Sequence, residues 1–111
     1  MLTLYQAEWC PYSSSVRERL TELGIDFVAR QVEPEPEQRD AMRQRTGTDS
    51  IPVLETENGA YVQGTRAIFA YLERFAQPPD ARGHRRQYDA HREARERDAP
   101  GQILRRAAPI D

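Results

Sequence analysis

The sequence contains one cysteine, no lysine and no long apolar run among its 111 residues. One cysteine cannot form an internal disulfide framework, and it cannot supply a four-ligand zinc site. No apolar stretch approaches the roughly 20 residues of a membrane-spanning helix, so we expect no membrane partner. The N-terminal segment MLTLYQAEWC has neither a basic region nor a long apolar core, and we expect no signal peptide. A reducing, cytoplasmic location is the default expectation for such a chain.

Charged residues are numerous and unevenly distributed. They make up 31% of the chain, and all 16 basic residues are arginine. Residues 1–76 carry 8 arginines and 12 acidic residues, whereas residues 77–111 carry 8 arginines and 6 acidic residues, which gives net charges of −4 and +2. Neither part is basic enough to indicate a nucleic-acid partner.

The spacing of apolar residues predicts one α/β domain over residues 1–76. LTLYQ, DFVARQV, IPVLET and AYVQ are typical of strands, and Asn58-Gly59 is a hairpin signal between the last two. Two helix faces have apolar residues three or four positions apart, namely Val16, Leu20 and Leu23, and then Ile68, Leu72 and Phe75. PEPEQRDAMRQRTG is expected to form one further helix that ends at Gly47. The order β-α-β-α-β-β-α predicts a mixed four-stranded sheet with flanking helices.

Residues 77–111 do not continue this pattern. PPDARG has the composition of a linker, and HRRQYDAHREARERD has helix-forming residues but an apolar stripe that is mostly alanine. We therefore place a domain boundary at residue 76 and predict a charged extension over 77–111 that is partly helical or disordered. Three interpretations of this extension stay open: a solvated tail, a segment that docks on the acidic domain, and a partner-binding segment.

The only cysteine, Cys10, lies in AEWCPYSSS at a predicted strand-to-helix turn. Free N–H groups at the helix start and the positive end of the helix dipole favour thiolate over thiol. The dipole contributes about 0.3–2 kcal/mol, which lowers a cysteine pKa from about 8.5 to near 7 at most. A larger shift requires hydrogen bonds to the sulfur from backbone amides or from the Ser13 hydroxyl. We interpret Cys10 as a reactive cysteine in preference to an inert buried one.

Two further segments become relevant if they lie near Cys10. In SIPVL, Pro52 would free the amide of Ile51 to bind a peptide-like ligand, and the ordinary alternative is a trans proline that opens a strand. In VQGTRAI, Gly64 and Thr65 begin a helix, and Thr65 is the expected N-cap. Helix starts also bind carboxylates, although capping alone is the commoner explanation.

Together these segments resemble the glutaredoxin and glutathione S-transferase N-terminal-domain branch of the thioredoxin fold. WCPYS, TDSIPVL and VQGTRAIFAYLERF match that family in order and spacing over residues 1–76. The resemblance implies a thioredoxin-like fold in which Cys10 is the nucleophile and Tyr12 flanks the thiol. It also implies that Ile51 and a cis-Pro52 hold the cysteinyl backbone of glutathione.

The same resemblance implies two anion-binding positions. Gly64 and Thr65, at the start of the last helix, would bind the γ-glutamyl carboxylate of glutathione. Arg43 or Arg45, on the second helix, would reach the glycyl carboxylate.

Two positions depart from the family pattern. Ala7 stands where glutaredoxins usually have a lysine, and Arg66 stands where an acidic residue commonly binds the α-amino group of glutathione. GTRAI also resembles the transferase pattern ESRAI, with Gly64 and Thr65 in place of the acid and the serine. The partner thiol is therefore left open between glutathione and another low-molecular-weight thiol.

Ser13 stands at the position of the second cysteine in a dithiol motif, either as the native residue or as an engineered replacement. A serine cannot resolve a mixed disulfide within the molecule, but a free thiol can do so from solution. The leading hypothesis is a one-thiol, glutathione-dependent thiol-disulfide oxidoreductase that acts on glutathionylated proteins through Cys10. One alternative is a glutathione-binding module that holds a bridging [2Fe-2S] cluster in a dimer, with Cys10 as the ligand and no other metal site. Another is a thioredoxin-fold partner-binding protein with little turnover.

Overall fold

A mixed four-stranded sheet forms the centre of the computed structural model, which describes residues 1–91. Its strands are β1 (Leu2–Gln6), β2 (Phe27–Gln31), β3 (Val53–Glu55) and β4 (Tyr61–Gln63). They lie in the order β2-β1-β3-β4. Strand β1 pairs parallel with β2 and antiparallel with β3, and β3 pairs antiparallel with β4. This confirms the mixed sheet predicted from the sequence.

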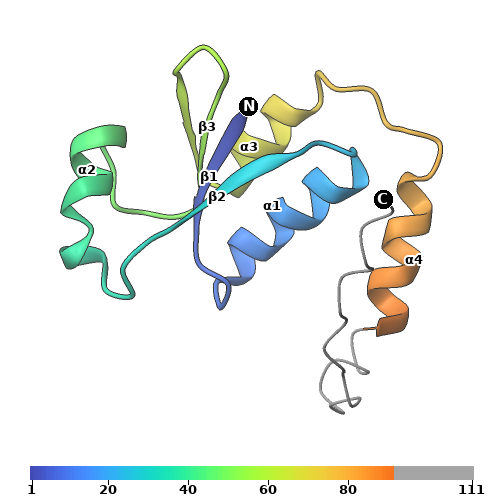
Figure 1. Cartoon of the computed structure of the whole chain (residues 1–111), viewed down its shortest axis with the longest axis horizontal. Coiled ribbons are helices and arrows are strands. Elements are labelled where there is room, and N and C mark those ends of the chain that lie inside the picture. The colour runs from blue at the N-terminus through green and yellow to red at the C-terminus, as the bar shows by residue number, and fades with distance from the viewer. Residues whose placement is uncertain (92–111) are drawn as a thin grey trace, which may run out of the picture.

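Helices cover the two faces of this sheet (Figure 1). The helices are α1 (Pro11–Glu22), α2 (Asp40–Thr46) and α3 (Thr65–Leu72). Because successive side chains of a strand point to opposite faces, neighbours in β1 enter different cores. Leu4 packs with residues of α1 and α3 in the larger core, whereas Tyr5 packs with Met42 of α2 in the smaller one. The predicted apolar faces of the first and last helices are confirmed, since they supply the larger core.

The second predicted helix is divided into two pieces. A 3-10 turn, η1 (Pro36–Gln38), precedes α2, and Arg39 between them has φ −87° and ψ 50°, outside the helical region. The side chain of Arg39 is buried, with 3% of its surface exposed. It donates hydrogen bonds of 2.8–3.1 Å to the backbone carbonyls of Glu33, Pro34 and Asp49. The predicted end at Gly47 is confirmed, because this residue caps α2 with a φ of 84°.

The start of α3 differs by one residue from the prediction. Gly64 is the N-cap, and Thr65 is the first helical residue, with no side-chain hydrogen bond at the cap. Gly64 has φ 95° and ψ 150°, a conformation that is essentially restricted to glycine. The predicted hairpin turn is confirmed, since Gly59 takes a φ of 85° and the Thr56 amide donates to the Ala60 carbonyl at 2.8 Å.

A fourth helix, α4 (Ala81–His91), lies beside α1 (Figure 1). Arg85 of α4 pairs with Glu18 of α1 at 3.4 Å and also with Glu22, which is largely buried. The first part of the predicted extension therefore docks on the acidic domain, while residues 92–111 lie outside the described part of the chain. Within residues 1–91, no helix has both the length and the apolar character needed to cross a membrane.

Candidate functional site

Three loops meet at one edge of the sheet. Tyr5 of β1 pairs with Val53 of β3, and Val53 pairs with Gln63 of β4. The end of β1, the start of β3 and the end of β4 therefore lie side by side. The predicted site segments adjoin these three strand ends: Cys10 follows β1, Ile51 and Pro52 precede β3, and Gly64 and Thr65 follow β4.

The Ile51–Pro52 peptide bond is cis, as the resemblance implies and in contrast to the trans alternative. The Pro52 carbonyl accepts a hydrogen bond of 3.0 Å from the amide of Gly64, so the second and third segments are in direct contact. Pro52 is buried, and Ile51 is half-buried against the small core that contains Tyr5. The loop before β3 is thus held by the hydrogen bond from Gly64 and by the packing of Ile51.

Cys10 is the N-cap of α1, with φ −80° and ψ 119°. Its amide donates to the Ala7 carbonyl at 3.1 Å, and its sulfur accepts from the amide of Ser13 at 3.4 Å. Pro11 follows as the first helical residue, where its missing N–H removes no helical hydrogen bond. Only 5% of the Cys10 surface is exposed, so neighbouring residues cover most of it.

The pKa of the Cys10 thiol lies below its ordinary value. Burial raises the pKa, but it is outweighed by hydrogen bonds from the Ser13 hydroxyl and from the amides of Ser13 and Tyr12 together with the charge of Arg17. The helix start therefore stabilises the thiolate through direct hydrogen bonds to sulfur, in addition to its dipole.

Ser13 is fully buried, and its hydroxyl lies between the Ala7 amide and the Cys10 sulfur in the hydrogen-bond network. The amide of Ala7 donates to Ser13 Oγ at 3.5 Å. Because that contact occupies an oxygen lone pair, the hydroxyl hydrogen is available for the sulfur of Cys10. Ser13 thus acts as a donor in the place where a dithiol motif has a second thiol.

Exposed aromatic residues flank Cys10 in the sequence. Tyr12, which the sequence analysis predicted, is 64% exposed, and Trp9, which it did not, is 65% exposed. Both therefore present large aromatic side chains to solvent close to the reactive residue in the sequence. The sequence signal that could have identified Trp9 is a tryptophan directly before the reactive cysteine, since aromatic residues are enriched at contact surfaces.

The two arginines predicted to bind the glycyl carboxylate are both paired with acidic residues. Arg43 donates to Asp49 at 2.7 Å and also contacts Asp40. Arg45 lies 3.6 Å from Glu55, at the end of β3 that is remote from the cis-proline. Arg43 therefore pairs with a residue of the loop before Ile51, and Arg45 pairs with a residue of β3. The binding role of both stays a prediction.

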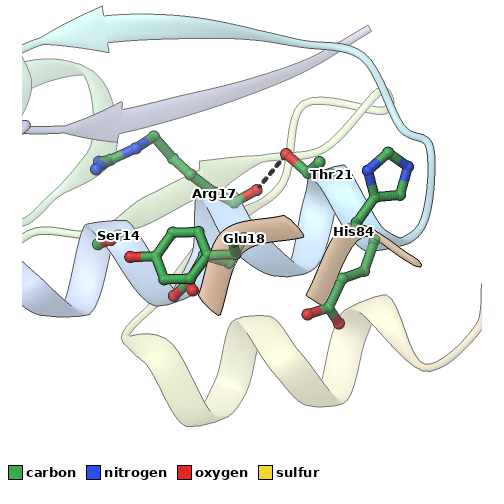
Figure 2. Close-up of a pocket in the computed structure, with 7 residues that line it drawn as sticks. Ser14, Arg17, Glu18, Thr21 and His84 are labelled. Carbon is green, nitrogen blue, oxygen red and sulfur yellow. Dashed lines mark hydrogen bonds between the residues drawn. The ribbon is translucent and has the colours of Figure 1, made fainter. Parts of the chain in front are cut away.

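A groove of about 190 Å³ separates α1 from α4 (Figure 2). Ser14, Arg17 and Thr21 line it from α1, and His84 and Tyr88 line it from α4. Arg17 also reaches the loop before Cys10, so it is shared by the groove and the site. In the described part of the chain, no three His, Cys, Asp or Glu side chains gather as they would to hold a metal ion.

The model of the family described as glutathione S-transferase, N-terminal domain, matches residues 4–80. The chain belongs to this family, and the match extends slightly beyond the boundary that the sequence predicts at residue 76. The comparison with curated proteins gives no match.

Solved structures show the same relationship. A glutathione S-transferase domain-containing protein from Marinobacter aquaeolei is 28% identical over 68% of this chain and 40% of its own, with a TM-score of 0.59. A diazinon-metabolizing glutathione S-transferase from Bombyx mori is 30% identical over 65% of this chain and 36% of its own, with a TM-score of 0.57. Glutaredoxin 2 from Salmonella typhimurium, solved in complex with glutathione, has a TM-score of 0.59 over 84% of this chain and 45% of its own.

The glutaredoxin is only 14% identical to this chain, so that likeness shows the fold, which is thioredoxin-like. The chain spans less than half the length of these three proteins. The fold and the family membership are established on this basis, and the activity of the longer proteins does not transfer with them.

Proposed function

We propose that this chain is a one-thiol, glutathione-dependent thiol-disulfide oxidoreductase that acts on glutathionylated proteins. The observation that supports it most directly is the hydrogen-bonded sulfur of Cys10 at the start of α1, with its lowered pKa. A thiolate is the attacking form in disulfide exchange, so this arrangement raises the reactive fraction at neutral pH. The serine at position 13 limits the chemistry to a cycle that needs one protein thiol.

In the first step, the Cys10 thiolate attacks the glutathionyl sulfur of a protein–glutathione mixed disulfide. A Cys10–glutathione disulfide forms, the substrate disulfide breaks, and the substrate leaves as a thiolate that takes up a proton. In the second step, the thiolate of a free glutathione attacks the glutathionyl sulfur on Cys10. Glutathione disulfide forms, and the Cys10 thiolate is regenerated. One mixed disulfide is reduced, and two glutathionyl groups leave as the oxidised product.

The loop before β3 and the start of α3 would bind the glutathionyl group. The Ile51 backbone next to the cis-proline is suited to pair with the cysteinyl backbone of glutathione. Gly64 and Thr65 would bind the γ-glutamyl carboxylate, and the absence of a side-chain cap on α3 leaves that helix start to an external anion. Arg43 is the better placed of the two arginines for the glycyl carboxylate, since its partner Asp49 lies two residues before Ile51.

The test uses a glutathionylated peptide as substrate, with free glutathione as the reductant. Wild type should accelerate deglutathionylation, and Cys10→Ala should reduce the rate to the uncatalysed level. After treatment with glutathione disulfide, mass spectrometry should show one glutathione adduct on wild type and none on Cys10→Ala. Equal rates for the two proteins, or no adduct on wild type, would contradict the proposal.

The proposal keeps the catalytic domain at residues 1–76. Helix α4 belongs to the extension and packs on that domain through the ion pairs of Arg85. The bridging [2Fe-2S] cluster and the low-turnover partner-binding protein stay predictions. No contact within residues 1–91 favours either of them over the one-thiol cycle.

A further inference from the structure

Arg17 connects α1 to the segment that precedes Cys10. In Figure 2 its side chain runs toward the N-terminal end of α1, away from His84. Its guanidinium donates to the side-chain oxygen of Gln6 and lies 3.4 Å from the Ala7 carbonyl. It also lies 3.3 Å from the carboxylate of Glu8, and only 21% of the Arg17 side chain is exposed. One guanidinium thus contacts three consecutive residues.

The Ala7 peptide group is where these contacts reach the thiol. Its carbonyl accepts from the amide of Cys10 at 3.1 Å as well as from Arg17, and its amide donates to Ser13 Oγ at 3.5 Å. The neighbouring residue Gln6 is fully buried and donates to Gln31 of β2 at 3.0 Å, which holds the other side of the segment. Movement of the Ala7 peptide would therefore change the position of Cys10 and the orientation of the Ser13 hydroxyl together.

We propose that Arg17 is a positioning residue for the Cys10 thiolate, because it holds the Ala7 peptide where that peptide orients the Ser13 hydroxyl toward the sulfur. This inference rests on the proposed function, in which the thiolate is the attacking group. The planar guanidinium can donate to two acceptors and pair with a carboxylate at the same time, and a lysine ammonium cannot reproduce that geometry. The motif itself carries no such cation before Cys10, where the sequence has Ala7 and Glu8.

Direct charge is a second way in which Arg17 acts on the sulfur, and the two effects can be separated. The positive charge of Arg17 lowers the pKa of Cys10. Glu8 faces the same guanidinium and offsets part of that charge. If Arg17 acted through its charge alone, Arg17→Lys would keep the wild-type pKa of Cys10. If Arg17 also positions the Ala7 peptide, the lysine variant keeps only part of the lowering of that pKa.

The experiment measures the pKa of Cys10 from the pH dependence of alkylation by iodoacetamide, without glutathione. Arg17→Met should raise the pKa by about 1 unit, since it removes a charge and loosens a donor to sulfur. Arg17→Lys should give an intermediate value. A wild-type pKa of Cys10 in either Arg17→Met or Arg17→Lys would overturn the positioning role. If Arg17→Met does not fold, the lysine variant alone decides by the same criterion.

A double substitution tests the route through Ser13. If Arg17 acts by orienting that hydroxyl, Arg17→Met should add little to Ser13→Ala, with a further shift well below the one it produces in wild type. Full additivity would mean that Arg17 acts by charge alone and would overturn the inference. The matched control is Arg19→Met, on the same helix, because Arg19 lies 5.0 Å over the ring of Phe69 and pairs with Glu22 at 3.8 Å, with no contact to the Ala7 peptide.

Failure of this inference is distinguishable from failure of the proposed function. Alkylation measures the pKa of the Cys10 thiol without any substrate. The glutathione adduct and the deglutathionylation rate of wild type test the proposed function. A low wild-type pKa that Arg17→Met leaves unchanged refutes the positioning role alone. A wild type with no adduct and no exchange refutes the function, whatever the variants do to the pKa.

Discussion

Replacing Ser13 by alanine removes one donor to the Cys10 sulfur and keeps another. The Ser13 amide remains 3.4 Å from the sulfur, whereas the hydroxyl bond is lost. A hydrogen bond to a charged group contributes roughly 1.5–3 kcal/mol, and one pKa unit corresponds to about 1.4 kcal/mol. Because Cys10 is only 5% exposed, water does not readily replace the lost donor. We expect the pKa of Cys10 to rise by about 1–2 units.

The assay compares alkylation and deglutathionylation rates over a range of pH. At pH 7 the variant has less thiolate and should react more slowly than wild type. A thiolate of higher pKa is also intrinsically more nucleophilic, with a Brønsted coefficient of about 0.4–0.5. Above its own pKa, Ser13→Ala should therefore exceed the wild-type rate, so the two pH–rate curves should cross.

The control is Ser15→Ala, which removes a hydroxyl bonded to the Pro11 carbonyl at 3.1 Å and not to sulfur. It should leave the Cys10 pKa unchanged. The reasoning is refuted if Ser13→Ala has the wild-type pKa, if Ser15→Ala shifts it equally, or if the pH–rate curves stay parallel.

The same lowered pKa makes a prediction about stability. The folded state holds Cys10 at a pKa below that of the unfolded chain, which is about 8.5. The resulting stabilisation is fully present above the unfolded value and is lost as pH falls through the folded value. The unfolding free energy of wild type, relative to Cys10→Ala, should therefore increase as pH rises from the folded pKa towards the unfolded value of about 8.5. A difference that shrinks over this range in urea titrations would contradict the assignment.

Substitutions of Arg39, Gly64 and Arg85 test the scaffold, with Arg82 and Gly83 as controls. Arg39→Met should lower the unfolding free energy in urea by roughly 3 kcal/mol, since three backbone carbonyls lose the buried guanidinium that donates to them, while exposed Arg82→Met should leave it nearly unchanged. Gly64→Ala should destabilise by about 1–3 kcal/mol through its φ of 95° alone, because no atom lies within 4 Å of an added Cβ. Gly83→Ala, in the interior of α4, should instead keep or raise the melting temperature. Arg85→Met should speed hydrogen exchange of the α4 amides by severalfold without a large change in melting temperature, since the ion pairs it removes are partly exposed.

Local sequence patterns were sufficient to predict most of the fold. Apolar periodicity located the four strands and the first and last helices, and Gly47 and Gly59 marked a helix end and a turn because both positions need positive φ. The place of Cys10 at the start of α1 followed for the same reason. The grouping of Cys10 with the loop before β3 and the start of α3 came from the family resemblance.

Contacts between distant segments were not predictable in this way. The divided second helix depends on Arg39, whose three acceptors lie in separate stretches of backbone and are brought together only by folding. Arg17 reads in the sequence as one of several arginines on a helix, yet its spacing of four residues from Ser13 places it on the same helical face. The docking of α4 depends on the ion pairs between Arg85 and two carboxylates of α1. The sequence left docking open as one of three interpretations and did not indicate which residues would pair.

The identity of residue 13 affects both the cycle and the thiol. A cysteine there could resolve a mixed disulfide within the molecule, but its S–H group is a weaker donor than a hydroxyl. Serine removes the intramolecular route and supplies the stronger donor, held in place by the amide of Ala7. In the proposed cycle, the residue that makes the reaction dependent on an external thiol therefore also favours the thiolate that attacks first. Under the proposed function Ser13 is part of a one-thiol site, and its hydroxyl is one of the groups that lower the pKa of the buried Cys10 thiol.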